Sequence, residues 1–110
     1  MPKATLGGME IEIDEDGFIQ EPEKWNKEVA EDLGKIEAQY TAGADRMGDD
    51  HWTIVNYLRD YYLEYEIAPP IRMVTRKTGI DLKKIYELFP KGPAVGGCKV
   101  AGLPKPTGCV

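Results

Sequence analysis

The chain has 110 residues, of which 42% are hydrophobic and 30% charged, and its formal net charge is −5 at pH 7. This length fits one domain, and the hydrophobic share can build a modest core without a disulfide framework. No apolar run is long enough to cross a membrane, and the N-terminus leads into Gly and acidic residues rather than into a secretion signal. We therefore expect a cytoplasmic protein, in which free thiols stay reduced unless they cycle.

The charge is unevenly distributed along the chain. Residues 1–66 contain six Lys and Arg against seventeen Asp and Glu, whereas residues 67–110 contain eight Lys and Arg against two acidic residues. The two parts thus carry formal net charges of −11 and +6, respectively. A basic C-terminal part on an acidic body predicts a directional electrostatic surface for a partner, with chance clustering as the alternative.

Residues 9–19 predict a β-hairpin. Apolar and acidic side chains alternate, turn at Asp16-Gly17 and resume at Phe18-Ile19. Asp-Gly between alternating hydrophobic residues is a strong hairpin signal because both turn residues tolerate positive φ. The returning strand is short, so we expect a small two-stranded ribbon packed on helices.

The next segment predicts an amphipathic helix that starts near Pro22, which suits the first turn. Its apolar face repeats at helical spacing and consists of Trp25, Val29, Leu33, Ile36 and Tyr40. Gly34 weakens this helix, and Gly43 is expected to end it.

A second helix is expected to start at Asp49-Asp50, after the turn-rich segment 41–50. Its dense apolar stripe consists of Ile54, Leu58, Tyr61, Tyr62 and Tyr65. The helical spacing favours core packing with tyrosine hydroxyls at the rim over a stacking platform. His51, the only histidine, lies beside two aspartates, so we expect a local electrostatic partner rather than a catalyst.

Two short helices follow Pro69-Pro70 and are joined by a tight turn at Gly79. The buried side of the first is expected at Ile71, Val74 and Thr78. The second is capped by Asp81 and closed by Pro90, with inward-facing residues expected at Leu82, Ile85, Tyr86 and Phe89. Such a pair forms a helix-turn-helix unit.

The predicted helix-turn-helix carries five basic residues: Arg72, Arg76, Lys77, Lys83 and Lys84. A transcriptional regulator that binds DNA through this unit is therefore one candidate function. Against it, the chain is acidic, with a pI of about 4.9, and the second helix of the pair lacks the Asn, Gln and Arg that read base edges. The same basic face would serve equally to dock an acidic protein.

The last twenty residues contain both cysteines, five glycines and three prolines. They show no helical or strand period, so we expect residues 1–90 to form a helical body and residues 91–110 a mobile arm. Carboxylates elsewhere show no acid/base pair. Two cysteines and one histidine cannot complete a tetrahedral zinc site in one chain without an Asp or Glu or a second subunit, so no metal site is expected.

Cys98 and Cys109 are the candidate reactive groups. Their spacing is too wide for a C-x-x-C turn, but an arm that folds back can bring them together. One thiolate can accept sulfur as a persulfide or attack a sulfur held by a partner, and the second can resolve the product as an internal disulfide. Lys99 and Lys105 would modestly favour the thiolates. A structural disulfide that closes the loop is the alternative, which a reducing cytosol disfavours.

The tail GPAVGGCKVAGLPKPTGCV resembles the C-terminal arm of the DsrC/TusE family, including both cysteines and the penultimate place of Cys109. DEDGFIQEPEKW (14–25), DHWTIVNYLRDYYLEYEIAPPIRMVTRKTG (50–79) and IYELFPKGP (85–93) resemble family patterns in the same order. The resemblance implies a mainly α domain with a helix-turn-helix core, a short N-terminal β-hairpin and a flexible C-terminal arm. Because both cysteines are present, the chain is most similar to the DsrC members, the gamma subunits of dissimilatory sulfite reductase.

By this resemblance, Cys109 would take up the sulfur produced from sulfite between the alpha and beta subunits of the reductase. Cys98 would then close a trisulfide with it, for reduction by a membrane-bound thiol/disulfide reductase complex. The chain would be a monomeric carrier and co-substrate, not an independent enzyme, and would bind no cofactor. Siroheme and iron–sulfur clusters would belong to its partners.

Relatives with one cysteine act as relays in tRNA thiolation, which implies sulfur-transfer proteins as further partners. The five basic residues become candidates for docking or for holding the arm. The direction of sulfur flow stays open, as does a purely structural subunit role.

Overall fold

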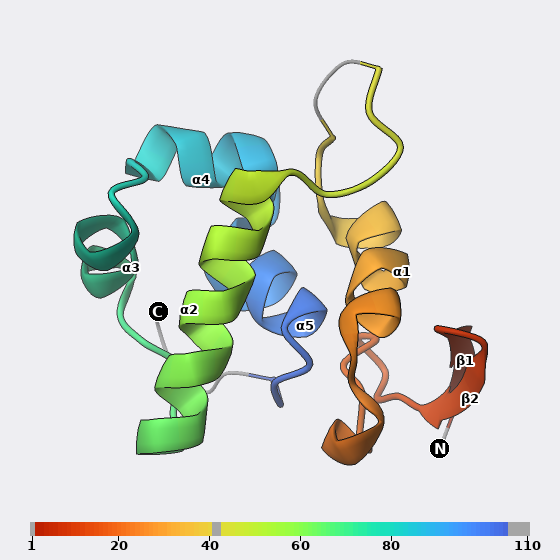
Figure 1. Cartoon of the computed structure of the whole chain (residues 1–110). Coiled ribbons are helices and arrows are strands. Elements are labelled where there is room, and N and C mark those ends of the chain that lie inside the picture. Colours follow the sequence, from red (N-terminus) through yellow and green to blue (C-terminus); the bar gives the residue numbers. More distant parts are fainter. Residues whose placement is uncertain (1, 41–42, 106–110) are drawn as a thin grey trace.

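A computed structural model of the chain describes residues 2–40 and 43–105. The fold is mainly helical with one small antiparallel sheet, as predicted (Figure 1). Its elements in chain order are β1 (Lys3–Leu6), β2 (Met9–Glu12), the 3-10 turn η1 (Pro22–Lys24), α1 (Lys27–Glu37), α2 (Asp49–Tyr65), α3 (Ile71–Thr78), α4 (Leu82–Leu88), the π-helical turn η2 (Pro93–Gly97) and α5 (Cys98–Val100). Among the described helices, none has the length and apolar character needed to span a bilayer.

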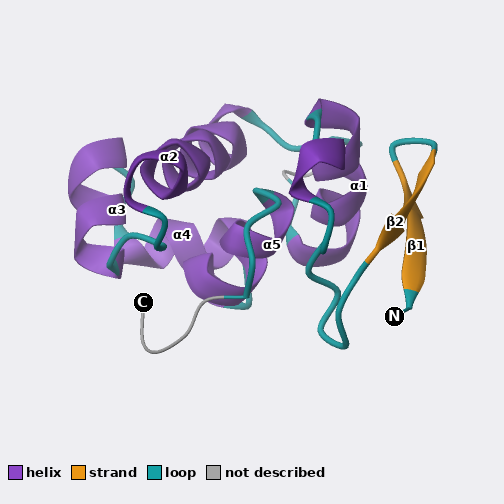
Figure 2. Cartoon of the chain, turned by 90° about the horizontal axis from the view of Figure 1, so that it is seen from below, coloured by secondary structure: helices purple, strands orange, loops and turns teal. Residues whose placement is uncertain are grey.

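The helices surround the C-terminal helical segment. η2 and α5 are continuous, and α5 contacts both α1 and α2, between which it lies in both views (Figures 1 and 2). α3 packs against α2, and the hairpin stands at the end of the molecule beside α1 (Figure 2). The element with the weakest periodicity in the sequence therefore occupies the centre of the fold.

The hairpin uses a different partner strand from the one predicted. β2 pairs with β1 in antiparallel register, and Gly7 and Gly8 make the turn at φ of 58° and 77°. Two successive positive φ angles suit the two-residue turn that matches the twist of paired strands. The reversal at Asp16-Gly17 exists, but it yields only one isolated bridge, Ile13 to Ile19. The predicted return strand is wrong because Phe18 and Ile19 are both buried in the core and cannot alternate.

The first helix begins later and ends earlier than predicted. Pro22 opens only η1, and α1 begins after Asn26, whose side-chain oxygen accepts a hydrogen bond from the Val29 N–H at 2.9 Å. This N-cap satisfies one of the free amides at the helix start. Trp25 thus lies outside the helix, which ends at Glu37 rather than at Gly43. Ile36, predicted to face the core, is 69% exposed.

The predicted start of α2 at Asp49 is confirmed. Ile54 and Leu58 are fully buried, and Tyr61 is half-buried, whereas Tyr65 is exposed. The rings of Tyr61 and Tyr65 lie 4.5 Å apart along the outer face. The stripe therefore supplies core packing through its aliphatic members and places its last tyrosine at the surface.

His51 is a buried structural histidine, 1% exposed. Its Nδ1 accepts a hydrogen bond from the Gly48 N–H at 3.0 Å, so its Nε2 carries the proton and donates to the Gln39 carbonyl at 2.9 Å. Its hydrogen-bond partners are thus backbone groups, whereas Asp50, one of the two neighbouring aspartates, acts on the ring only through its charge. Burial lowers the pKa of His51 below its ordinary value, and the hydrogen bond to Gln39 opposes this in part.

We expect His51 to make stability depend on pH. The pKa of His51 is lower in the folded state than in the unfolded chain, so the unfolded state binds more protons at acidic pH. The free energy of unfolding should therefore fall as the pH drops below about 6.5, by at most ~1.4 kcal/mol per pH unit. Urea unfolding between about pH 7.5 and 5.5 measures this slope. A His51→Gln variant with an unchanged slope would contradict the assignment.

α3 and α4 form the predicted pair of short helices. Gly79 ends α3 at φ 75°, and the Asp81 side chain accepts a hydrogen bond from the Lys84 N–H at 2.9 Å. The inward face of α4 differs from the prediction: Leu88 is buried, whereas Leu82 and Tyr86 are each 49% exposed. The buried stripe consists of Ile85, Leu88 and Phe89. Tyr86 lies about 100° further around the helix than Ile85, and Leu82 is the first residue of α4.

Candidate functional site

Cys98 lies on a helix in the core, not on a mobile arm. Residues 93–100 form one continuous helical segment, here named the Cys98 helix. Cys98, Val100 and Ala101 are fully buried, and Leu103 is 3% exposed. The folded body therefore extends at least to Leu103, and the predicted boundary at Pro90 is wrong.

The glycines of this segment explain the error. A Cβ on Gly97 would lie 2.8 Å from Leu58 Cδ1, and one on Gly96 would lie 3.2 Å from Phe89 Cβ. Both glycines let the backbone of the Cys98 helix approach its neighbours closely. The sequence suggests that these glycines make the segment flexible, whereas in the structure they allow close packing. This role depends on the neighbouring elements, so the local sequence does not indicate it.

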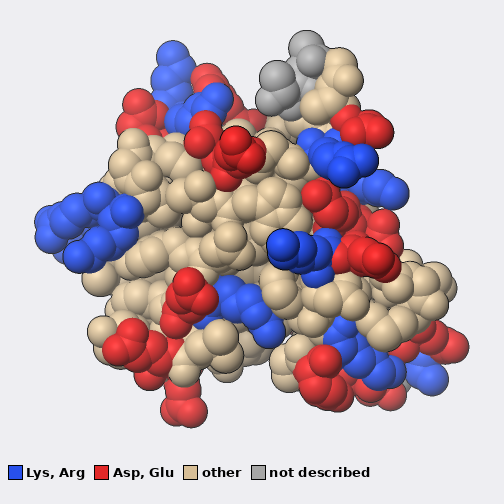
Figure 3. Space-filling model, viewed as in Figure 1, with Lys and Arg blue, Asp and Glu red and all other residues tan. Residues whose placement is uncertain are grey.

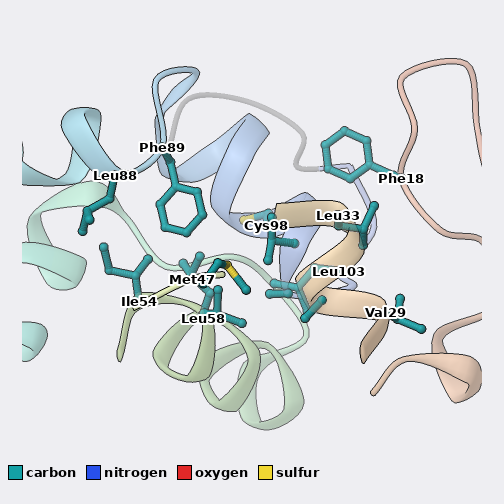
Figure 4. Packing of buried hydrophobic residues seen from close by; sticks show 14 of the residues in the cluster. Phe18, Val29, Leu33, Met47, Ile54, Leu58, Leu88, Phe89, Cys98 and Leu103 are labelled. Atoms are coloured by element: carbon teal, nitrogen blue, oxygen red, sulfur yellow. The ribbon is translucent and has the colours of Figure 1, made fainter. Parts of the chain in front are cut away.

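The Cys98 thiol is shielded by apolar side chains. It belongs to the same buried cluster as Leu33, Leu58 and Leu103 (Figure 4). Burial raises the pKa of the Cys98 thiol to about 12. In this packing Cys98 is therefore a protonated thiol at neutral pH and a poor nucleophile.

The two lysines expected to assist the thiols are engaged elsewhere. Lys99 Nζ lies 2.7 Å from Glu37 Oε1, and both residues are buried. Lys105 forms an exposed ion pair with Asp16. Neither contributes to the pKa of Cys98, whose shift is caused by burial.

The C-terminal end of the Cys98 helix is capped first by the backbone that follows it. The Leu103 N–H donates to the Cys98 carbonyl at 3.0 Å, and the Gly102 N–H donates to the Lys99 carbonyl at 3.1 Å. With Gly102 at φ 74°, this is a Schellman motif. It leaves two carbonyls, those of Val100 and Ala101, for other donors.

Two side chains from distant elements satisfy these carbonyls. Trp25 Nε1 donates to the Val100 carbonyl, and Arg59 Nη1 donates to the Ala101 carbonyl, each at 2.9 Å. The Arg59 guanidinium stacks over the Trp25 ring at 4.0 Å. Its positive charge at the negative end of the helix adds to this cap.

Glu37, the last residue of α1, holds the other side of the helix. Its Oε1 accepts the buried bond from Lys99, and Lys91 approaches the same oxygen at 3.6 Å. Its Oε2 is buried and, within the described residues, has no hydrogen-bond partner. The Glu37–Lys99 pair therefore ties the end of α1 to the residue that follows Cys98.

Residues 5–110 match the family model described as "DsrC like protein". The chain belongs to the DsrC family. It is 44% identical over 110 residues, the full length of both proteins, to the "Sulfite reductase, dissimilatory-type subunit gamma" of Nitratidesulfovibrio vulgaris. It is 36% identical over 110 residues to the "Sulfurtransferase TusE" of Escherichia coli, with 94% of this chain and 95% of that protein covered.

Solved structures give the same relationship. The crystal structure of the oxidized gamma subunit of dissimilatory sulfite reductase (DsrC) from Archaeoglobus fulgidus aligns with a TM-score of 0.83 at 43% identity, and covers 99% of this chain and 100% of that one. The solution structure of DsrC from Pyrobaculum aerophilum aligns with a TM-score of 0.78 at 49% identity, and covers 99% and 95%. The mainly helical fold with its small sheet is thus the DsrC fold.

The remaining predicted site residues of this DsrC-family chain are only partly placed. Cys109 lies outside the described residues, so its role and the mobility of the arm around it stay predictions. In the described part of the chain, no cluster of three or more His, Cys, Asp or Glu side chains could hold a metal.

The five basic residues are all exposed on α3 and α4: Arg72, Arg76, Lys77, Lys83 and Lys84. Figure 3 shows Lys and Arg side chains gathered over α3. Among the ion pairs of the described residues, none involves these five. Their use in docking, in arm contacts or in DNA binding stays a prediction.

Sequence reasoning missed the residues that hold the Cys98 helix: Trp25, Glu37 and Arg59. The spacing of Trp25 predicts a place on a helix face, and no pattern in the sequence singles out Glu37 or Arg59. The partners of these three side chains lie 75, 62 and 42 residues away in sequence. No local pattern signals contacts of that separation.

Proposed function

We propose that this DsrC-family protein is a sulfur carrier and co-substrate of a dissimilatory sulfite reductase, with Cys109 as sulfur acceptor and Cys98 as resolving thiol. Full-length similarity to a gamma subunit of that reductase, together with two cysteines in the matching tail, carries the proposal. Similarity to TusE sulfurtransferases supports the coarser sulfur-carrying role. The protein delivers sulfur between partners and is not an independent enzyme.

The environment of Cys98 supports this order of the two thiols. Its buried thiol is held protonated by a pKa of about 12, so it is unsuited to attack first. Cys109 therefore takes the sulfur, and Cys98 reacts with the loaded Cys109. For sulfite as the source, one sulfite, two thiols, two electrons from the reductase and four protons give one trisulfide and three waters.

The second half of the cycle regenerates the carrier. A membrane-bound thiol/disulfide reductase complex supplies four electrons and four protons to the trisulfide, which yields sulfide and the two free thiols. Thiol–disulfide exchange reactions of this kind proceed by attack of a thiolate on a sulfur–sulfur bond. The carrier must leave one complex to reach the other, so the free protein is a cytoplasmic monomer.

The partners follow from the same chemistry. Cys109 reaches the sulfur source between the alpha and beta subunits of the reductase, to which siroheme and iron–sulfur clusters belong, while this chain binds no cofactor of its own. Other sulfur-transfer proteins are further partners. The basic face of α3 and α4 provides a surface for docking acidic partners.

Sulfur loading tests the proposal. After turnover with the reductase and sulfite, intact-mass analysis of the wild-type protein should show one added sulfur bridging the two cysteines. Cys109→Ser should lose all loading because it removes the proposed acceptor and the remaining thiol, Cys98, is buried. Cys98→Ser should still load sulfur on Cys109 as a persulfide but form no trisulfide.

The matched control is the wild-type protein incubated with sulfite but without the reductase, which should stay unmodified. Normal loading of Cys109→Ser would overturn the assignment of the acceptor. Unchanged sulfide production by a variant without either cysteine would favour a purely structural subunit.

A further inference from the structure

The proposed cycle needs the Cys98 thiol, yet the structure buries it completely. A loaded Cys109 cannot bond to a sulfur atom that stays fully buried. Some part of the Cys98 helix must therefore move before the second thiol can react. The contacts that keep this helix in place are then part of the control of the reaction.

The Cys98 helix lies between two glycines that both have positive φ angles. Gly92 precedes it at φ 86°, and Gly102 follows it at φ 74°. Its first turn, η2, is π-helical, a form that occurs mostly as single turns and frequently at functional sites. Both ends of the helix therefore have backbone positions that absorb a change of direction at low steric cost.

The end nearest to Cys98 is held by two specific hydrogen bonds. Trp25 and Arg59 donate to the carbonyls of Val100 and Ala101, two and three residues after Cys98. The two side chains also stack on each other at 4.0 Å, so displacement of one removes support from the other. They come from different elements, a loop before α1 and the middle of α2, and meet only at this helix end.

We propose that Trp25 and Arg59 are positioning residues that hold the Cys98 helix closed, and that Cys98 becomes available to the loaded Cys109 only when this contact opens. This inference rests on the proposed sulfur-carrier function. It assigns no new covalent step. In the closed state the protein protects its second thiol from small oxidants and from premature disulfide formation, while Cys109 seeks its partner.

Native-state alkylation of Cys98 tests the inference in a Cys109→Ser background, with N-ethylmaleimide as the probe. Without urea, Cys98 should react slowly, through a local opening whose urea dependence is well below that of global unfolding. Arg59→Leu should speed this reaction about tenfold or more because a charge-assisted hydrogen bond is lost. Trp25→Phe, which keeps an aromatic ring but removes the indole N–H, should act in the same direction.

The pH profile distinguishes reaction of the buried thiol from reaction through an opened helix, while the urea dependence separates local opening from a general loss of stability. If the buried thiol reacted directly, the alkylation rate would increase with pH toward a midpoint at the pKa of about 12 that burial imposes on Cys98. Reaction through an opened helix should instead follow an ordinary thiol, with a midpoint near ~8.5. Arg59→Lys, which keeps a cationic donor, should restore most of the protection.

Val74→Ala is the matched control. Val74 is fully buried on α3 and has no part in the helix cap, so this variant should lower global stability but leave the reaction without urea unchanged. Wild-type reaction rates for Arg59→Leu and Trp25→Phe would overturn the inference. A urea dependence equal to that of global unfolding in every variant would also overturn it.

The assay contains no reductase and no sulfite, so its outcome is independent of the proposed function. If Cys109 is loaded with sulfur normally but Arg59→Leu does not change the alkylation rate of Cys98, only the positioning role is wrong. If Arg59→Leu speeds alkylation of Cys98 but the wild-type protein takes up no sulfur from the reductase, the positioning role stands and the sulfur-carrier role is wrong.

Discussion

Gly102→Ala should lower the free energy of unfolding by about 3 kcal/mol or more. The first cause is the backbone, because a residue with a Cβ at φ 74° costs roughly 1–2 kcal/mol relative to glycine. The second is overlap with Trp25: the new Cβ would lie within 2.7 Å of Cγ. Trp25 would have to move, which breaks its bond to the Val100 carbonyl and its stacking with Arg59. Overpacking of this kind adds about 1–3 kcal/mol.

Urea unfolding followed by tryptophan fluorescence measures the loss. Gly79→Ala is the matched control, because Gly79 has nearly the same φ, 75°, but a Cβ there would meet nothing within 4 Å. It should show the backbone cost alone. Equal losses in the two variants would mean that the close approach of Gly102 to Trp25 contributes nothing to stability.

Glu37→Leu should destabilise the fold by about 3–5 kcal/mol, because it leaves the Lys99 ammonium buried without its partner. Lys99→Met should cost a similar amount by stranding the Glu37 carboxylate. The double variant should regain most of this loss, since two apolar side chains of similar volume replace a fully desolvated pair. The free energies of unfolding of the wild type and of these three variants form a double-mutant cycle that isolates the pair.

Lys105→Met is the control for this cycle. Lys105 also forms an ion pair, with Asp16, but both side chains are more than half exposed. An exposed pair contributes at most ~1 kcal/mol, so this variant should be nearly neutral. If Glu37→Leu is equally mild, the Glu37–Lys99 pair does not anchor the Cys98 helix, and Lys99 reaches water once its partner is gone.

Short sequence patterns determined several helix ends and turns of the fold. The start of α2 at Asp49, the turn at Gly79 and the cap by Asp81 were all predicted, because caps and turns depend on residues within three or four positions of one another. The two cysteines could also be selected as candidate reactive groups from the sequence. The hairpin was predicted with the wrong partner because Gly7-Gly8 competed with Asp16-Gly17, and only packing of Phe18 in the core decides between them.

The placement of Cys98 was decided by tertiary structure alone. Residues 91–103 have the composition of an arm, and the small side chains that erase their periodicity are the ones that let them pack against α2 and α4. Their anchors, Trp25, Glu37 and Arg59, lie 42 to 75 residues away from their partners along the chain. Local sequence thus identified the thiol, and long-range packing decided that it is buried, protonated and held closed.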